Sequence, residues 1–372
     1  MSYREFDKVG NPDPQRETHV EQAVGRNLHR YLPNPVPSPL HGRDHHRSHP
    51  KQLYVVTVVS NPIRFKSRYK LYKEFERHMH ESEVTLITVE QALGDRHFAI
   101  TDKGNPNHVQ VRTFDELWHK ENMINLGIQR VLQNYPDAEY LAWIDADVEF
   151  TRKDWVNETL HQLQHHMVVQ LFQNAIDLGP DGETMKIHTG FAASYLSGAK
   201  IPMPGEISYY GYGGPGNLWH PGYAWAARRE ALDGLGGLYD VSILGSGDHL
   251  MAWALIGHGA ERLPSSMSKG YRYSLQLWEN NAEKFIQRDI GFVHGTILHA
   301  FHGPKAARNY KGRWKILEEF KFDPFTDLKK DVQGLFQLNM GTTTIPDKRM
   351  IGLRDAIRRY FRARNEDSIS KE

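Results

Sequence analysis

The stretch YLAWIDADVEF, residues 140–150, gives the strongest indication of the fold and the chemistry of this chain. Its apolar run LAWI is typical of a strand that is buried on both faces of a parallel sheet. Asp145 and Asp147 follow one residue apart, and burying such a pair is costly unless a cation or an array of donors meets it. A divalent cation at the end of a strand is one interpretation, and a pair of ordinary turn aspartates is the other.

Strand and helix patterns alternate around this stretch. LYVVTVVS (53–60), VTLITVE (84–90) and MVVQLFQNAID (167–177) predict further strands. FKSRYKLYKEFERHMH (65–80), FDELWHKENMINLGIQRVLQNYP (114–136, with Thr113 as N-cap) and residues 154–164 predict helices. This order predicts an α/β fold with a mostly parallel central sheet and helices on both faces.

Changes in composition divide the chain into three parts. Residues 1–50 end in a run containing five prolines and four histidines and predict an extended arm without a function of its own. Residues 51–325 form the expected catalytic domain. Residues 326–372 form a C-terminal extension, in which residues 347–364 predict an amphipathic helix with seven basic and two acidic side chains.

The overall composition excludes several classes of protein. The chain of 372 residues has no cysteine, so disulfides, thiolate nucleophiles and cysteine-ligated metals are excluded. The formal net charge of +1 generates no strong overall field. No stretch has the apolar length of a signal peptide core or a membrane span, and we therefore expect a soluble, cytoplasmic protein with no membrane insertion.

Two downstream segments carry further candidate chemistry. HGTILHAFH (294–302) places His299 and His302 three residues apart, where both rings can reach one metal ion, although a single histidine is more often simply hydrogen-bonded. GSGDH (245–249) precedes an apolar helix pattern and places Asp248 at the start of that helix. Asp248 is therefore a candidate general base, or a residue that caps its own helix.

Basic and aromatic side chains complete the set of candidates. Arg64, Lys66 and Arg68 near the first strand can bind a diphosphate or can simply be solvated, and the same alternatives apply to Lys120 and Asn122. A segment rich in glycine and aromatic residues (208–230) follows the fourth predicted strand, where it can cover a ligand site. Its flat side chains are candidates for stacking on a sugar or a base, or for core packing: Trp219, His220, Tyr223 and Trp225.

Taken in order from about Val55 to Arg313, these segments resemble the β-1,4-galactosyltransferase family of GT-A glycosyltransferases. The resemblance rests on VVSNPIRFKSR, LWHKENMINLGIQ, YLAWIDADVEF, HPGYAWAARREALDGLGGLYD, GSGDHLMAWAL and the His299–His302 segment. The family's cysteines, membrane anchor and stem are missing, which favours a bacterial or bacteriophage enzyme.

The resemblance implies a role for each matching residue. Asp147, His299 and His302 would hold Mn²⁺ or Mg²⁺, and Asp145 would lie near the metal or the donor ribose. Asp248 would be the base of an inverting displacement. Donor binding would involve Asn61, Pro62, Arg64, Arg68 and Lys120. Leu244 and Gly247 replace the family's tryptophan and glutamate, which help to bind an N-acetylglucosamine acceptor.

The resulting hypothesis is a metal-dependent hexosyltransferase that uses a nucleoside diphosphate sugar, with a UDP-sugar as first choice. The acceptor is a glycan or a modified nucleobase in DNA. In the DNA case the basic helix at 347–364 would contact phosphates, whereas the alternative is a helix that is docked on the domain with its arginines in water. A non-catalytic sugar-binding protein of the same fold and a metal-dependent phosphohydrolase are the competing functions.

Overall fold

The computed structural model describes residues 51–202, 217–341 and 347–370. The arm predicted for residues 1–50, and the part of the predicted covering loop that falls in residues 203–216, lie outside the described residues.

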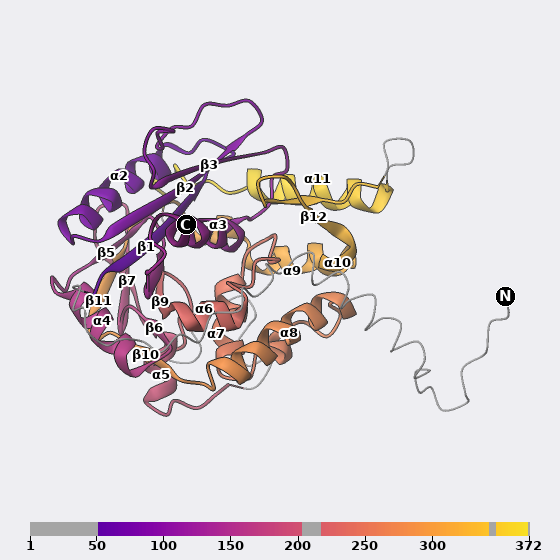
Figure 1. Ribbon diagram of the computed structural model, residues 1–372. Helices are drawn as coiled ribbons and strands as arrows, with labels where there is room; N and C mark the ends of the chain where they lie inside the picture. Colours follow the sequence, from indigo (N-terminus) through magenta and orange to yellow (C-terminus); the bar gives the residue numbers. More distant parts are fainter. Residues whose placement is uncertain (1–50, 203–216, 342–346, 371–372) are drawn as a thin grey trace, which may run out of the picture. The chain divides into compact units, whose positions relative to one another are not determined.

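A seven-stranded sheet forms the centre of the described fold (Figure 1). Its strands, in spatial order, are β10 (Ile290–Phe292), β6 (Val168–Gln170), β9 (Ala224–Arg228), β4 (Tyr140–Ile144), β1 (Leu53–Ser60), β2 (Thr85–Leu93) and β3 (His108–Thr113). β9 runs antiparallel to both of its neighbours, and the other pairs are parallel. The predicted α/β fold with a mostly parallel central sheet is confirmed.

Helices cover both faces of this sheet because its central strands are apolar on both sides. In β1, Val55 packs in the same core cluster as Phe75 of α2, whereas the next residue, Val56, packs in the other core cluster with Met123 of α3. The helices before the C-terminal region are α2 (Lys66–Glu81), α3 (Lys120–Asn134), α4 (Trp155–His165), α5 (Phe191–Leu196), α6 (Arg229–Leu235), α7 (Gly247–Leu255), α8 (Lys269–Phe285) and α9 (Tyr310–Glu319). Short 3-10 turns span Ala260–Arg262 and Lys305–Arg308.

A second sheet of four strands lies beside the first and has the order β5 (Val148–Phe150), β11 (Thr296–His299), β7 (Asn174–Leu178) and β8 (Thr184–Thr189). It corrects two predictions, because the single strands expected at 140–150 and 167–177 are each divided between the two sheets. The loop 145–147 separates β4 from β5. Asp145 and Asp147 interrupt the first apolar run and Leu171 and Phe172 continue the second, but neither local pattern indicates that the hydrogen bonding passes to another sheet.

The start of the second predicted helix, expected over residues 114–136, was also wrong. Thr113 does not cap a helix: it ends β3, a strand that was not predicted, and its hydroxyl accepts a hydrogen bond from the Asp115 amide at 3.1 Å. The helix α3 begins only at Lys120. The intervening residues are held by other parts of the chain, since the Trp118 amide donates to the Ile243 carbonyl at 2.8 Å.

The C-terminal region belongs to the same core as the rest of the described fold. α10 (Pro324–Asp327), the pair β12 (Leu328–Lys330) and β13 (Phe336–Leu338), and α11 (Lys348–Arg362) follow α9. The apolar face predicted for α11 is buried, as Leu353 and Ile357 show, and joins the core cluster that contains Val56 and Met123. Among the described residues, no helix combines the length and apolar character needed to cross a membrane.

Candidate active site

The loop between β4 and β5 presents Asp145 and Asp147 at the carboxyl end of β4, the central strand of the large sheet. The backbone fixes this loop at both ends: the Asp145 amide donates to Tyr223 O at 2.8 Å, and the Asp147 carbonyl accepts from the Ala300 amide at 2.9 Å. Position 300 follows β11 directly, so the second of these bonds brings the late histidine segment against the aspartates.

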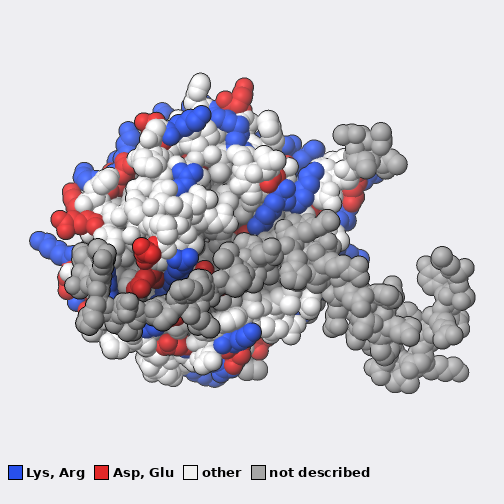
Figure 2. All heavy atoms as spheres, viewed as in Figure 1, with Lys and Arg blue, Asp and Glu red and all other residues white. Residues whose placement is uncertain are grey.

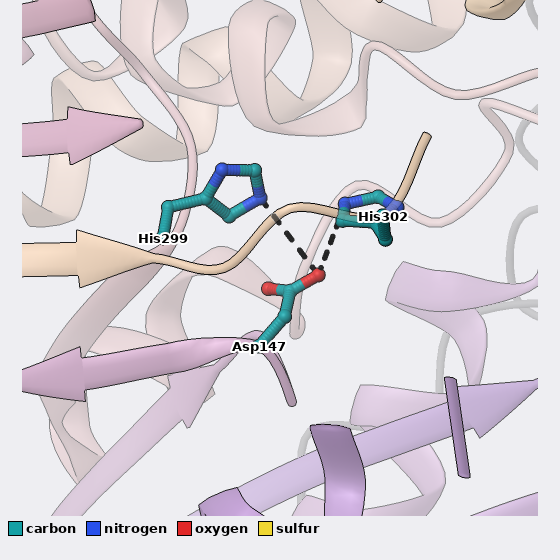
Figure 3. A group of neighbouring side chains, drawn as sticks. All are labelled: Asp147, His299 and His302. Atoms are coloured by element: carbon teal, nitrogen blue, oxygen red, sulfur yellow. Dashed lines mark ion pairs between the residues drawn. The ribbon is translucent and has the colours of Figure 1, made fainter. Parts of the chain in front are cut away.

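Asp147, His299 and His302 converge, as Figure 3 shows. The distances from Asp147 Oδ2 are 3.8 Å to His299 Nε2 and 3.2 Å to His302 Nε2. The pairing register of β11 with β5 explains part of this convergence, because His299 at the end of β11 pairs with Val148, the residue after Asp147. Residues more than 150 positions apart in sequence thus offer one oxygen and two nitrogen ligands to a single point.

The protonation of this cluster favours a cation. Burial, together with the Arg308 guanidinium, lowers the pKa of His302 to about 4, so its ring is neutral at pH 7 and can act as a ligand. Burial opposes ionisation of Asp147, but His299, His302 and nearby guanidiniums hold its pKa below the ordinary value. Asp147 Oδ1 is buried and accepts no hydrogen bond from the described residues, as expected of an atom whose partner is a metal ion.

Asp177 contacts the edge of the His299 ring opposite to Asp147, and it was not predicted as a site residue. It stands opposite His299 in the pairing of β7 with β11, and its Oδ1 lies 2.9 Å from His299 Nδ1. The same carboxylate accepts from Tyr223 OH and lies against His188 Nε2, both at 2.7 Å. A carboxylate at Nδ1 places the proton there and leaves the Nε2 lone pair directed at the metal position.

Asp145 is not part of the metal group. Its carboxylate pairs with Lys120 Nζ at 2.5 Å, and Lys120 is the first residue of α3. Against the effect of burial, the charges of Asp145, Asp248 and Glu121 raise the pKa of Lys120 above its ordinary value. This geometry therefore does not support the prediction of Asp145 as a direct metal ligand. Asp145 lines the cavity beside Lys120.

Asp248 lines the same cavity as the metal group, as do Asn61, Pro62 and Arg68. It lies in the first turn of α7, where the N-cap residue Ser246 makes no side-chain hydrogen bond, so both roles considered for Asp248 stay open. Its Oδ1 accepts from the adjacent His249 amide at 2.8 Å. Its Oδ2 faces Gly222, where an added Cβ would lie only 2.9 Å away.

Glu121 is a second carboxyl at this end of the cavity, and it was not predicted either. Gly247 makes room for it, because a Cβ at position 247 would lie 2.5 Å from Glu121 Cδ. Burial first, and then the charge of Asp248, raise the pKa of Glu121 to about 8. The side chain is therefore mostly protonated at neutral pH.

Five further predicted site residues differ in their relation to the cavity. Arg64 is exposed and is not among the residues that line the cavity. His220 and Tyr223 do line it, but Trp219 and Trp225 do not. Trp219 stacks on Trp253 in the core at 5.1 Å, and Trp225 donates to Pro221 O at 2.8 Å. We correct the prediction accordingly: these two indoles pack the core and offer no face to a sugar.

Comparisons with known proteins give only distant likenesses. No protein-family model matches the chain, and no curated protein matches it. One similar solved structure is a Drosophila β-1,4-galactosyltransferase 7 mutant with manganese, UDP-Gal and xylobiose (13% identity, 56% of this chain, TM-score 0.27). A second is glucosyl-3-phosphoglycerate synthase from Mycobacterium tuberculosis with Mn²⁺, UDP and phosphoglyceric acid (14% identity, 67% of this chain, TM-score 0.29). A third is a glycosyltransferase involved in the glycosylation of the major capsid of PBCV-1 (10% identity, 83% of this chain, TM-score 0.24).

The chain spans 62% of the length of the Drosophila protein, 71% of the mycobacterial protein and 99% of the third protein. Likenesses this weak do not assign a family, so the function is argued from the site alone.

Proposed function

We propose that this chain is a metal-dependent, inverting glycosyltransferase of the GT-A type that transfers a hexose from a nucleoside diphosphate sugar to a hydroxyl acceptor. A UDP-sugar is the first choice of donor. The observation that carries the proposal is the meeting of Asp147, His299 and His302 in a cavity that also contains Asp248 and Arg68.

The three converging side chains would hold Mn²⁺ or Mg²⁺, since carboxylate oxygen and neutral imidazole are suitable ligands for Mn²⁺. The ion would neutralise the diphosphate leaving group. Arg68 lines the same cavity and supplies a guanidinium suited to phosphate oxygens, and Lys120 adds a cation on the side of Asp145.

Asp248 would act as the general base. It would take the proton of the acceptor hydroxyl while the hydroxyl oxygen forms its bond to the anomeric carbon and the bond from that carbon to the diphosphate oxygen breaks. The electron pair of the broken bond leaves with the diphosphate, and a single displacement of this kind inverts the anomeric configuration. His220 and Tyr223, which line the cavity, are the remaining candidates for contact with the acceptor.

The acceptor is a glycan or a modified nucleobase in DNA. Lys and Arg side chains gather over α11 in Figure 2, but several are already paired. Arg362 donates to Glu116 at 2.8 Å, and Arg354 lies 2.8 Å from Asp355. Arg359 is exposed and is the better probe of DNA contact: if Arg359→Gln left the salt dependence of DNA binding unchanged, this contact would be excluded.

A thermal-shift screen of nucleoside diphosphates and their sugars, with and without Mn²⁺, tests the function. Selective ligands stabilise the folded state according to their occupancy, so a metal-dependent rise in Tm with one nucleotide is expected. Release of nucleoside diphosphate from the selected sugar then tests the chemistry. Release of inorganic phosphate would instead indicate a phosphohydrolase, and binding without turnover of any donor would indicate a non-catalytic protein.

A further inference from the structure

The segment after α11, residues 364–367, returns to the candidate active site and inserts Glu366 into it. Glu366 is 3% exposed. Arg68 donates to this carboxylate through Nε and, at 2.8 Å, through Nη2, and Arg364 Nε lies 2.8 Å from Oε1. Burial opposes its ionisation, but Arg68 and Arg364 hold the pKa of Glu366 well below the ordinary value.

The same carboxylate stands behind His302. Glu366 Oε2 lies 3.7 Å from His302 Nδ1, while His302 Nε2 faces Asp147 on the opposite edge of the ring. His299 has a closer form of this arrangement, with Asp177 Oδ1 within hydrogen-bond distance of Nδ1 at 2.9 Å and Nε2 toward Asp147, whereas the contact of Glu366 with His302 is an ion-pair distance without a hydrogen bond. Each imidazole of the metal group is thus placed between Asp147 and a second carboxylate.

Three contacts fix the position of this segment. The Asp367 carboxylate accepts from the amides of Lys66 and Ser67 at the start of α2, at 3.0 and 2.9 Å. The Ser67 hydroxyl donates to the Glu366 carbonyl at 3.0 Å. Gly303, with φ +85°, lets the segment pass, because a Cβ there would lie 2.3 Å from the Asn365 carbonyl oxygen.

Glu366 orients Arg68 but engages only some of the N–H donors of the Arg68 guanidinium. Both hydrogen bonds engage the Nε and Nη2 side of the guanidinium, and Nη1 makes no hydrogen bond with the described residues. A guanidinium has five N–H donors in a fixed plane, so holding one edge directs the remaining donors. Since Arg68 lines the cavity, those donors are available to a ligand there.

We propose that Glu366 is a positioning residue of the metal and donor site, which the C-terminal segment completes by holding the His302 ring and the Arg68 guanidinium from behind. This inference rests on the proposed function, because it concerns the same metal and the same diphosphate. It assigns residues 364–367 to the site, beyond the part of the chain in which the ligands themselves lie.

Manganese titration of the full chain tests the proposal, with free Mn²⁺ measured by electron paramagnetic resonance. Loss of a carboxylate behind a ligating histidine typically weakens metal binding by about 10–100-fold, so we expect a change in this range for Glu366→Gln. UDP binding in the presence of Mn²⁺, measured by calorimetry, should weaken as well, because Arg68 loses its orientation. Asp355→Asn, at a partly exposed position of α11, is the matched control and should leave both affinities unchanged.

A second variant covers the case in which Glu366→Gln does not fold. Asp367→Asn removes only an exposed anchor of the segment, and we expect it to weaken Mn²⁺ binding in the same direction. Unchanged or tighter binding in a folded Glu366→Gln variant, or in Asp367→Asn when Glu366→Gln does not fold, would overturn the positioning role and leave the proposed function intact. Absence of Mn²⁺ binding in the wild-type chain would overturn both.

Discussion

At the scale of single residues, the proposed function depends on a few groups whose burial and neighbours suit the roles that we propose for them. Asp147 is buried at one oxygen without a hydrogen-bond partner among the described residues, and it faces two imidazoles. Asp248 lies in the same cavity in the first turn of α7. In the proposed function these two carboxylates have different roles, since Asp147 would bind a cation and Asp248 would accept a proton.

Asp248→Asn should abolish turnover while leaving Mn²⁺ binding intact. The amide has nearly the same shape but cannot accept the proton, and a general base typically contributes about 10²–10⁴-fold to the rate. The measurement is nucleoside diphosphate release from the donor sugar with Mn²⁺ present. Asp233→Asn, on the exposed surface of α6, serves as the control. Full activity of Asp248→Asn would show that another group is the base.

Asp177→Asn should weaken Mn²⁺ binding by roughly 10–100-fold. The amide can present its NH₂ group to His299 Nδ1, which would favour the wrong tautomer and withdraw the Nε2 lone pair. Asp289→Asn is a matched control, because Asp289 also lies against a histidine, His166, at 2.8 Å. Equal affinities of the Asp177 and Asp289 variants would argue that the carboxylate does not orient the ligand.

Glu121→Gln should make thermal stability less sensitive to pH. Because burial raises the pKa of Glu121 to about 8 from an ordinary 4.5, its contribution to stability is fully present below about pH 4.5 and is lost as the pH rises toward 8. The glutamine cannot ionise, so the Tm difference between variant and wild type should grow in favour of glutamine up to about pH 8. A flat difference from pH 5 to 9, beside the exposed control Glu319→Gln, would contradict this.

At the scale of elements, α3 delivers Lys120 and Glu121 to the cavity because it packs unusually close to the sheet. Gly127 permits that approach, since a Cβ there would lie 2.4 Å from Val56 Cγ1 in β1 and 3.1 Å from Val89 Cγ2 in β2. Neither valine can move easily, because both are fully buried.

Gly127→Ala should therefore destabilise the protein. Alanine favours the helix by about 1 kcal/mol over glycine, whereas overpacking a tight core costs about 1–3 kcal/mol. We expect a net loss of the order of 1 kcal/mol in denaturant unfolding. Gln133→Ala, at an exposed position of the same helix, should change stability little. An increase in stability for Gly127→Ala would mean that the sheet relaxes around the new methyl group.

At the scale of the whole described fold, the C-terminal region joins the core and the active site together. α11 buries Met350, Leu353, Ile357, Tyr360 and Phe361, and the residues after it supply Glu366. Burial of one such side chain contributes about 1.5–3 kcal/mol, so the five together rival the typical total stability of about 5–15 kcal/mol.

Truncation before residue 347 should leave a chain that does not fold cooperatively, as circular dichroism during thermal unfolding and limited proteolysis would show. Loss of DNA affinity on truncation would then reveal nothing about DNA contact, which is why the Arg359→Gln variant is the proper test. A truncated chain with the wild-type Tm would contradict the view that α11 is part of the core.

The sequence by itself determined the class of fold and indicated which side chains are candidate ligands for a divalent cation. Apolar runs buried on both faces predicted a parallel sheet, and Asp147, His299 and His302 were identified because carboxylate and imidazole suit a divalent cation. Such inferences succeed where a local pattern has one physical cause. They failed at Thr113 and at the breaks after β4 and β6, because no local pattern at these breaks shows that the hydrogen bonding changes from one sheet to the other.

Only the tertiary structure decided which groups support the site. Asp177 is one polar residue in a strand, Glu121 one acid in a helix and Glu366 one acid near the end of the chain, and none has a local pattern that marks it. Their roles come from register, from the space left by Gly247, and from the return of residues 364–367 to α2. Contacts between distant segments depend on the packing of the whole core, and for that reason local sequence could not reveal them.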